Sequence, residues 1–295
     1  MASRSLVIYR TASAVAGVIP QGVAIRLAES IGSRLGPRLM PGQAQQLASH
    51  IRRVRPGLKP SEVDDLVKGG FGSYGRFWVE LFTLPSVPGP MVGKRFKVEG
   101  YGHIQDVLDQ GRGPILALPH LGGWEWAAAW LGRVVGLQVT AVVERLEPPD
   151  LFDWFVSVRS NNGIDVVPLG GDSASRLVKA IRQSNIVCLL SDRDVVGNGI
   201  EVEFFGEKTM LPAGPALLSR RTGTPILPTA VYYDGSDHRA RVLGPIIPSP
   251  GISLRDDMAR MTNELARALE ELIADAPDQW HLLQPNWPSD LVTGS

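Results

Sequence analysis

The sequence predicts an α/β fold in which a largely parallel or mixed central sheet is flanked by helices and preceded by a helical N-terminal segment. Two observations support this prediction. From Arg95 onward, short apolar runs typical of strands alternate with helical stretches of about ten residues, which is the pattern of βαβ units. Before Arg95, the periodic segments are helical. We therefore expect residues 1–92 to form a helical segment and residues 93–295 to form one α/β unit.

The first helices are predicted from an apolar stretch that is repeatedly interrupted. Between residues 5 and 35, the apolar side chains are broken by Arg10, by Pro20-Gln21 and by Arg26. No uninterrupted run reaches the roughly 18 residues that a spanning helix needs, and no clear small-residue cleavage site ends a signal peptide. Two short helices joined at Pro20 fit better, either covering the α/β unit or lying on a membrane interface.

The remaining elements follow in order along the chain. Two more N-terminal helices are expected at residues 43–53 and 60–82. Strands are expected at residues 95–99, 115–119, 139–144, 166–169, 186–192, 201–205, 226–233 and 239–243. Helices are expected at residues 104–110, 124–135, 149–161, 174–183, 214–221 and 256–276. In such a fold the functional site lies beyond the carboxyl ends of the strands.

Composition and charge narrow the classes of function. The formal net charge of zero argues against a nucleic-acid partner. Residues 1–70 nevertheless contain ten Lys/Arg against four Asp/Glu, which indicates either an ordinary solvated surface or a basic surface facing anionic lipid. The single cysteine, Cys188, lies in an apolar run, so neither an internal disulfide nor a cysteine-rich metal site is available. A reducing cytosol is the natural compartment.

His120 has the most informative sequence context. An apolar strand runs into it, Gly122-Gly123 allows the chain to turn, and a helix begins near Trp124. Because the glycines break the helix, we expect Glu125 to point back from the first helical turn and accept the imidazole N–H. The plainer alternative is a loop histidine followed by a glutamate that the helix dipole favours. The helix N-terminus also offers a site for an anion.

Four segments together resemble the motifs of the lysophospholipid acyltransferase superfamily. Residues 118–126 resemble the first, in which four residues separate a His from an Asp or Glu. Arg159 and its neighbours resemble the second, residues 190–194 the third, and residues 211–228 the fourth. Across residues 95–290, including 277–281, the chain is similar to the branch of bacterial lipid A acyltransferases and, within it, to actinobacterial phosphatidylinositol mannoside acyltransferases.

This resemblance implies a glycerolphosphate acyltransferase-like fold and transfer of a fatty acyl group from a thioester to a hydroxyl. Acyl-CoA is the expected co-substrate, with no cofactor and no metal. His120 is the expected general base, acting on a hydroxyl that attacks the thioester directly, without an acyl-enzyme. Glu125 is the expected orienting carboxylate, Asp194 a second candidate and Asp192 a weaker one. The expected location is peripheral, on the cytoplasmic face of the plasma membrane.

The expected acceptor is an anionic glycolipid, whose mannose hydroxyl receives the acyl group. Arg159 could bind its phosphate in bidentate fashion, unless it simply faces solvent. Glu144, at the end of a strand, could hold sugar hydroxyls together with Asp192 and Asp194. Arg193 lies between these two aspartates and could bind substrate or simply neutralise them.

Other functions remain open at this point. Within the acyltransferases, the alternatives are a lipid A type enzyme with an acyl carrier protein donor and another lysophospholipid acyltransferase. A serine hydrolase is disfavoured because residues 171–175, the nearest match to a nucleophile elbow, lack the second glycine. The P-loop motif GxxxxGK[ST] is absent from the sequence, and no GxGxxG motif follows a predicted strand. A non-catalytic lipid-binding protein would have no need for His120 and Glu125.

Overall fold

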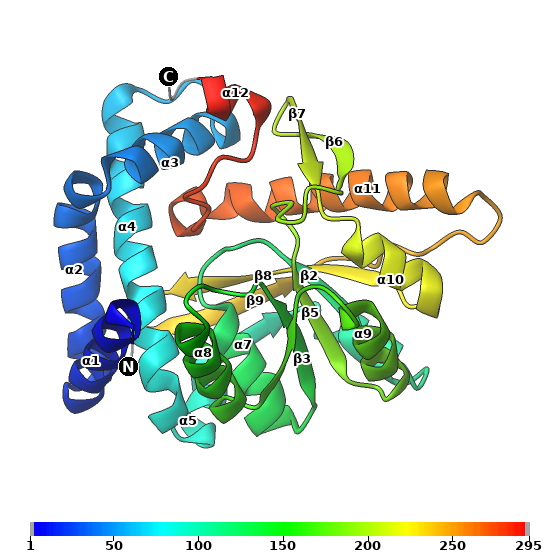
Figure 1. Ribbon diagram of the computed structural model, residues 1–295, viewed down its shortest axis with the longest axis horizontal. Helices are drawn as coiled ribbons and strands as arrows, with labels where there is room; N and C mark the ends of the chain where they lie inside the picture. Colours follow the sequence, from blue (N-terminus) through cyan, green and yellow to red (C-terminus); the bar gives the residue numbers. More distant parts are fainter. Residues whose placement is uncertain (1–2, 293–295) are drawn as a thin grey trace.

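The computed structural model describes residues 3–292 and shows a seven-stranded main sheet with helices on both faces (Figure 1). The strand order is β1-β9-β8-β2-β5-β3-β4. The strands are β1 (Phe96–Glu99), β2 (Ile115–Leu118), β3 (Val139–Val143), β4 (Ile164–Pro168), β5 (Ile186–Leu190), β8 (Ile226–Asp234) and β9 (Asp237–Val242). Neighbouring strands are parallel except β8 and β9, so β1 and β9 run against the other five. The predicted fold class is confirmed.

Helices cover both faces of this sheet. One face packs against α9 (Ser173–Arg182), α10 (Gly214–Thr222) and α11 (Leu254–Asp275). The other packs against α6 (Tyr101–Leu108), α7 (Trp124–Trp130) and the following turn η2 (Leu131–Val135). Alternation along β8 explains this division, because Ala230 belongs to the first core and Val231 to the second. The helix α8 (Pro149–Asn161) lies beside β4.

The predicted strand at 201–205 belongs to a separate hairpin outside the main sheet. It is β6 (Ile200–Phe204), and it pairs antiparallel with β7 (Glu207–Leu211), which the sequence analysis did not identify. Phe205 and Gly206 both have positive φ angles and form the turn between the two strands. This hairpin contacts α11 at the top of the molecule in Figure 1.

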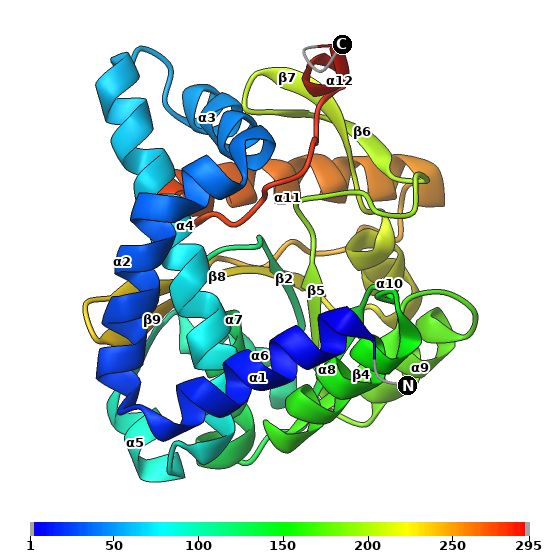
Figure 2. The same ribbon diagram turned by 60° about the vertical axis from the view of Figure 1, so that its left-hand side comes forward.

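The N-terminal region is helical, as predicted, and its helices pack on one another along one side of the α/β unit (Figure 1). Its elements are α1 (Arg4–Val18), α2 (Gln21–Leu39), α3 (Pro41–Val54), α4 (Pro60–Thr83), η1 (Leu84–Ser86) and α5 (Gly89–Lys94). The break at Pro20 separates α1 from α2, as expected. Figure 2 shows α1 running across the molecule toward α8, where the Ser3 N–H donates to Asp150 at 2.7 Å. Within residues 3–292, no helix combines the length and hydropathy needed to cross a bilayer.

After α11 the chain continues as an extended tail that returns to the middle of the molecule. It contains η3 (Pro277–Gln279) and ends in the short helix α12 (Pro288–Val292) beside α3 (Figure 1). Leu121, next to the end of β2, forms an isolated antiparallel bridge with Trp280 of this tail. The tail therefore lies against the edge of the sheet where β2 ends.

Candidate active site

Two central strands end side by side, with His120 following β2 and Asp192 following β5. Leu118 pairs with Leu190 in the parallel register, and His120 and Asp192 each lie two residues beyond this pair. Because the two strands run in the same direction, both side chains lie at the same edge of the sheet. The imidazole Nδ1 of His120 is 2.7 Å from Asp192 Oδ1. Sheet register thus brings a histidine and a carboxylate together across 72 residues of sequence.

Asp192 is fully buried, and both of its carboxylate oxygens accept hydrogen bonds. Oδ1 faces the imidazole, while Oδ2 accepts from the backbone N–H of His120 at 2.9 Å and from the indole N–H of Trp280 at 2.7 Å. Burial opposes ionisation, but the charge interaction and hydrogen bonds with His120 and Trp280 outweigh it and lower the pKa of Asp192. Asp192 is therefore an ionised acceptor for the imidazole.

The His120 side chain is 29% exposed, whereas Asp192 is inaccessible. With Asp192 ionised, the proton of the neutral imidazole lies on Nδ1 and the lone pair on Nε2. Nε2 makes no hydrogen bond to any residue in the described part of the chain. This leaves an oriented nitrogen on a partly exposed ring, and such a nitrogen can take a proton from a bound hydroxyl.

Steric crowding requires glycine at both positions of the Gly122-Gly123 turn. Gly122 has φ +61°, and a Cβ there would overlap the carbonyl of Val231. A Cβ on Gly123 would lie 2.8 Å from the His238 ring. Their amides are already occupied, since Gly122 donates to Gln279 at 2.9 Å and Gly123 donates to Val231 at 3.3 Å. The turn therefore fixes His120 against the sheet, and these two amides are not available to an oxyanion.

Glu125 does not contact the imidazole, which corrects the expectation that it orients His120. Its Oε1 accepts from Arg159 Nε at 2.8 Å, and the residue is 3% exposed. Helix geometry explains the difference, because Trp124 faces His120 with ring centroids 6.0 Å apart and the next residue points about 100° away. Arg159, expected to bind phosphate, is correspondingly held in an ion pair between α7 and α8.

Asp194 does not contact His120 either. Its Oδ1 accepts from the amides of Val196 and Gly197, each at 3.1 Å, and its Oδ2 accepts from Gly199 at 2.7 Å. Asp194 therefore closes the loop that leads into β6. Of the three carboxylates considered, the structure gives the hydrogen bond with His120 to Asp192.

Comparison with known proteins identifies the family. Residues 4–289 match the model of the bacterial lipid A biosynthesis acyltransferase family. The chain belongs to this family. It is 37% identical over 254 residues to the phosphatidylinositol mannoside acyltransferase of Mycolicibacterium smegmatis, covering 85% of this chain and 81% of that protein. The Mycobacterium tuberculosis protein of the same name is 36% identical over 274 residues, covering 91% and 84%. The lipid A biosynthesis lauroyltransferase of Escherichia coli is 25% identical over 270 residues, covering 89% and 84%.

These matches confirm the family expected from the four sequence motifs. The protein is an acyltransferase of lipid biosynthesis, similar to phosphatidylinositol mannoside acyltransferases and more distantly to a lipid A lauroyltransferase. The His120–Asp192 pair lies within the matched region.

Near this edge of the sheet, three charged side chains of the acyltransferase lack partners among residues 3–292. Glu144 and Arg145, which follow β3, are exposed, and Arg193, which follows β5, is half-buried. Within residues 3–292, none of them forms a side-chain hydrogen bond or ion pair. Arg193 therefore does not neutralise Asp192 or Asp194, contrary to one of the two expectations. Glu144, Arg145 and Arg193 are available to a polar substrate.

The tail supplies residues to which the sequence analysis gave no role. Trp280 donates to Asp192, the side-chain amide of Asn286 donates to the Asp192 carbonyl at 2.9 Å, and the His281 amide donates to the His120 carbonyl at 2.7 Å. Residues 277–281 are part of the resemblance to the family, but neither apolar periodicity nor spacing connects them with His120. A signal was present for Asp192, since the two residues that follow β2 and β5 occupy matching positions.

His281 is a second histidine near the site, but it is not a suitable base. Its Nε2 is 2.7 Å from Ser73 Oγ, and the residue is 6% exposed. Burial, aided by the charge of His120, lowers the pKa of His281 to about 3, so the ring stays neutral and inaccessible. Within residues 3–292, no group of three His, Cys, Asp or Glu side chains is arranged to hold a metal ion.

Proposed function

We propose that this acyltransferase transfers a fatty acyl group from acyl-CoA to a mannose hydroxyl of a phosphatidylinositol mannoside, with His120 as general base. The observation that carries the mechanism is the 2.7 Å contact between His120 Nδ1 and the buried Asp192 carboxylate, which leaves Nε2 of a partly exposed ring to act as the base. The glycolipid acceptor rests on the identities of 36–37% to two mycobacterial proteins named phosphatidylinositol mannoside acyltransferase.

The proton and the acyl group move in one balanced sequence. Nε2 of His120 takes the hydroxyl proton while the hydroxyl oxygen bonds to the thioester carbonyl carbon, and Asp192 stabilises the resulting imidazolium. The tetrahedral intermediate then breaks its carbon–sulfur bond. The CoA thiolate leaves and takes the proton from Nε2, so that free CoA and the acylated glycolipid form together and the imidazole returns to its starting state.

Two side chains that could form an acyl-enzyme precede Asp192 in the sequence by one and four residues, and neither is suited to it. Ser191 is fully buried, and its hydroxyl donates to the Leu189 carbonyl at 2.9 Å. Burial, with a smaller contribution from the charge of Glu125, raises the pKa of Cys188 to about 12, so the reactive thiolate is suppressed. Direct attack by the acceptor hydroxyl is therefore the simpler route.

The charged residues at the edge of the sheet support a polar, anionic acceptor. Arg145 and Arg193 are cations without partners in the described part of the chain, and Glu144 is a carboxylate without one. Arginine binds phosphate through charge-assisted hydrogen bonds, and a carboxylate accepts hydrogen bonds from sugar hydroxyls. Arg193 and Arg145 replace Arg159 as the proposed phosphate ligands, since Arg159 is paired with Glu125.

The proposal is tested by offering purified protein three acceptors with palmitoyl-CoA or palmitoyl acyl carrier protein as donor. The acceptors are a phosphatidylinositol mannoside, a lipid A precursor and a lysophospholipid. Free thiol and acylated lipid are measured together, the second by mass spectrometry. We expect equal amounts of CoA and acylated mannoside, and little transfer to the other acceptors.

Transfer to the lipid A precursor or the lysophospholipid, with none to the mannoside, would contradict the acceptor. A requirement for acyl carrier protein would contradict the donor. Arg193→Ala sharpens the test, because it should weaken use of the mannoside much more than hydrolysis of acyl-CoA by water, which needs no phosphate ligand.

We further propose that α1 and α2 contact the cytoplasmic face of an anionic membrane. Half of the exposed large apolar side chains among residues 3–292 lie within the first 39 residues. On α2, four of them recur every four residues and form one ridge, namely Val23, Leu27, Ile31 and Leu35, exposed by 40%, 49%, 56% and 47%. The opposite side of α2 packs tightly on α4 through Gly32 and Gly36, which face Phe71.

Charge on the same helix agrees with an anionic membrane. Arg26, Arg34 and Arg38 of α2 border this apolar ridge, and in the described part of the chain none of them pairs with a carboxylate. An amphipathic helix with apolar and basic side chains binds interfaces through both hydrophobic burial and attraction to anionic lipid. The ridge therefore supplies the apolar contact and the arginines supply the preference for anionic lipid.

Cosedimentation with vesicles tests this membrane contact. Binding should be stronger to vesicles with anionic phosphatidylinositol than to neutral vesicles and should weaken with salt. Leu27→Ser with Ile31→Ser should weaken binding about tenfold or more, because it removes two apolar side chains from the contact. The control is Ile247→Ser with Leu254→Ser, which are exposed by 64% and 51% near the start of α11, at the opposite end of the molecule in Figure 1. Equal losses in both double variants, or equal binding to neutral vesicles at high salt, would contradict the proposal.

A further inference from the structure

Asp192 depends on the tail for one of its hydrogen bonds. The indole N–H of Trp280 donates to Oδ2 at 2.7 Å, as short as the contact between Oδ1 and the imidazole. A distance of 2.7 Å is at the short end for an N–H···O bond and is typical of a charged acceptor. Trp280 therefore hydrogen-bonds to Oδ2 of Asp192, while the imidazole contacts Oδ1.

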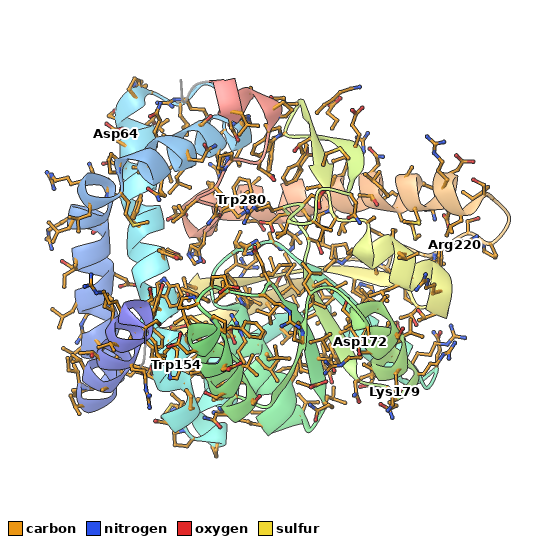
Figure 3. All side chains as sticks on the ribbon, viewed as in Figure 1. Asp64, Trp154, Asp172, Lys179, Arg220 and Trp280 are labelled. Atoms are coloured by element: carbon orange, nitrogen blue, oxygen red, sulfur yellow. The ribbon has the colours of Figure 1, made fainter. Side chains whose placement is uncertain are left out.

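The Trp280 ring is buried among other aromatic rings, so substrate cannot contact it. It is fully buried, and Figure 3 labels it in the interior, whereas Asp64 is labelled at the outside. Its ring centroid is 5.4 Å from that of His50, 6.0 Å from that of Phe205 and 6.3 Å from that of Phe204. Trp280 therefore does not bind substrate, and its indole N–H connects it to Asp192.

The same tail contacts the histidine and aspartate at two further points. The His281 amide donates to the carbonyl of His120 at 2.7 Å, and the side chain of Asn286 donates to the carbonyl of Asp192 at 2.9 Å. The end of β2 and the end of β5 are therefore joined by residues from a third part of the chain. The sheet register brings the two residues together, and the tail fixes their orientation.

An anchor away from the site holds the tail in place. Asp290 accepts from the amides of Asn286 and Trp287 at 2.9 and 3.1 Å, and it pairs with Arg53 at 2.8 Å on α3. Burial opposes ionisation of Asp290, but hydrogen bonds, first of all with His50, outweigh it and lower its pKa below the usual range. The tail is thus attached to the N-terminal helices on one side and to Asp192 on the other.

We propose that Trp280 is a positioning residue of the acyltransferase, whose indole N–H holds the Asp192 carboxylate in the orientation that directs Nε2 of His120 toward the acceptor hydroxyl. This inference rests on the proposed role of His120. Without the indole donor, the carboxylate can rotate away from the imidazole. It also loses a dipole that offsets its negative charge, so its interaction with the imidazole changes in strength as well as in direction.

Two titratable groups face His120 in this arrangement, Asp192 from the end of β5 and His281 from the tail. His281 stays neutral throughout the accessible range, because burial and the charge of His120 lower its pKa to about 3. A change in the acid limb of the activity profile on altering Trp280 therefore reports on the His120–Asp192 pair.

The test is Trp280→Phe, with Trp287→Phe as the matched control. Both tryptophans are buried in the tail and pack against Phe204, but Trp287 donates its indole N–H to the Phe204 carbonyl at 3.1 Å instead of to Asp192. Both variants should lose similar thermal stability. Trp280→Phe should lower kcat about tenfold or more, leave KM for acyl-CoA unchanged and shift the acid limb of the kcat profile. Trp287→Phe should keep kcat within about threefold and the acid limb in place.

An unchanged kcat and acid limb in folded Trp280→Phe would overturn the inference, as would the same shift in Trp287→Phe. His120→Ala separates this failure from that of the proposed function. If His120→Ala is inactive while Trp280→Phe behaves as wild type, only the role of Trp280 fails, whereas an active His120→Ala removes the proposed mechanism itself.

A second measurement needs no change at Trp280. In ¹⁵N-labelled protein, the indole N–H resonance of Trp280 should lie downfield and should move upfield in Asp192→Asn, because its acceptor loses its charge. The Trp287 resonance should stay in place. Equal movement of both resonances, or none in Trp280, would contradict the inference even if Trp280→Phe did not fold.

Discussion

Two histidine–carboxylate pairs have the same nitrogen–oxygen distance but lie in different surroundings. His120 Nδ1 is 2.7 Å from Asp192, and His238 Nε2 is 2.7 Å from Glu80. The His120 side chain is 29% exposed, whereas that of His238 is inaccessible and its ring stacks on Trp126 at 4.2 Å. A hydrogen-bonded histidine and carboxylate are therefore not sufficient for a candidate base. What distinguishes the pair at His120 is the partial exposure of its ring.

The electrostatic surroundings of the two pairs differ as well. The Glu80 carboxylate contacts both His238 and Arg76, and the Nε of Arg76 lies 2.8 Å from Glu80 Oε1. Burial lowers the pKa of His238, and Glu80 opposes this effect without overcoming it. His238 thus stays neutral and joins β9 to α4. Asp192 has no arginine partner within residues 3–292, so the charge that develops on His120 during acyl transfer would be balanced by Asp192 alone.

Removing His120 should give the largest effect on activity. His120→Ala is expected to lower turnover by about 10² to 10⁴, the usual contribution of a positioned general base. Its melting temperature should fall less than that of His238→Ala, because Asp192 keeps the hydrogen bonds from the amide of residue 120 and from Trp280. CoA release and circular dichroism melting measure the two effects. Turnover within a few-fold of wild type in folded His120→Ala would remove His120 from the mechanism.

The equivalent change at the buried pair should act on stability instead. His238→Ala removes one partner of a buried pair and the ring that stacks on Trp126, and we expect a loss of about 3 kcal/mol in the free energy of unfolding. Per folded molecule, kcat should stay within about threefold, since His238 touches no proposed substrate site. Urea unfolding and active-site-normalised rates check this. A loss of activity as large as that of His120→Ala would end the distinction between the two pairs.

Changing only the carboxylate tests whether orientation is part of catalysis. Asp192→Asn keeps the shape of the side chain but can place an amide N–H toward the imidazole, which favours the wrong tautomer. We expect kcat to fall about 10²-fold or more. The matched change, Glu80→Gln, should affect unfolding more than kcat. An Asp192→Asn variant with normal kcat would show that Asp192 only supports the structure.

The smallest expected effect is a loss of stability in mild acid. It arises because buried histidines stay neutral in the folded protein. An unfolded histidine takes up a proton near pH 6.5, whereas burial lowers the pKa of His281 to about 3 in the folded protein. Below pH 6.5 the unfolded chain therefore binds more protons, and stability falls as the pH falls. His281 should cost roughly 1 kcal/mol between pH 6.5 and 5.5. The lowered pKa values of Glu80 and Asp192 act only below their unfolded values of 4.5 and 3.8.

Urea unfolding at pH 6.5 and 5.5 measures this change in the free energy of unfolding. His281→Gln should unfold with a smaller dependence on pH than the wild type, because it removes one of the groups that protonate on unfolding. An equal dependence in both proteins would show that His281 is not held neutral.

Much of the fold could be predicted because strands and helices alternate with clear periodicity after Arg95. The separate hairpin was missed since β7 (Glu207–Leu211) is short and begins with three polar residues, so its sequence shows neither an apolar run nor the alternation of a strand. Periodicity describes single elements. It does not describe the register between strands that are far apart in the chain.

Because periodicity does not describe strand register, it also could not decide which carboxylate contacts His120. His120 could be identified from its local context, because a strand, a glycine turn and a helix start lie within a few residues. Its carboxylate was ranked wrongly, because Glu125 is close in sequence but points toward Arg159, whereas Asp192, the weakest of the three candidates, is brought in by the pairing of β2 with β5. Trp280 was less predictable still, since its contact depends on the path of the tail after α11.

The central claim is that an oriented, neutral His120 removes the proton of the acceptor hydroxyl. The most direct measurement is the pH dependence of kcat/KM for the glycolipid, compared with the NMR titration of the His120 ring nitrogens in the same protein. We predict that activity rises with pH along the same curve on which the imidazole of His120 loses its proton, and that Nδ1 keeps its proton at high pH. Activity that does not change across the titration of His120, or that follows the titration of another group, would contradict the account.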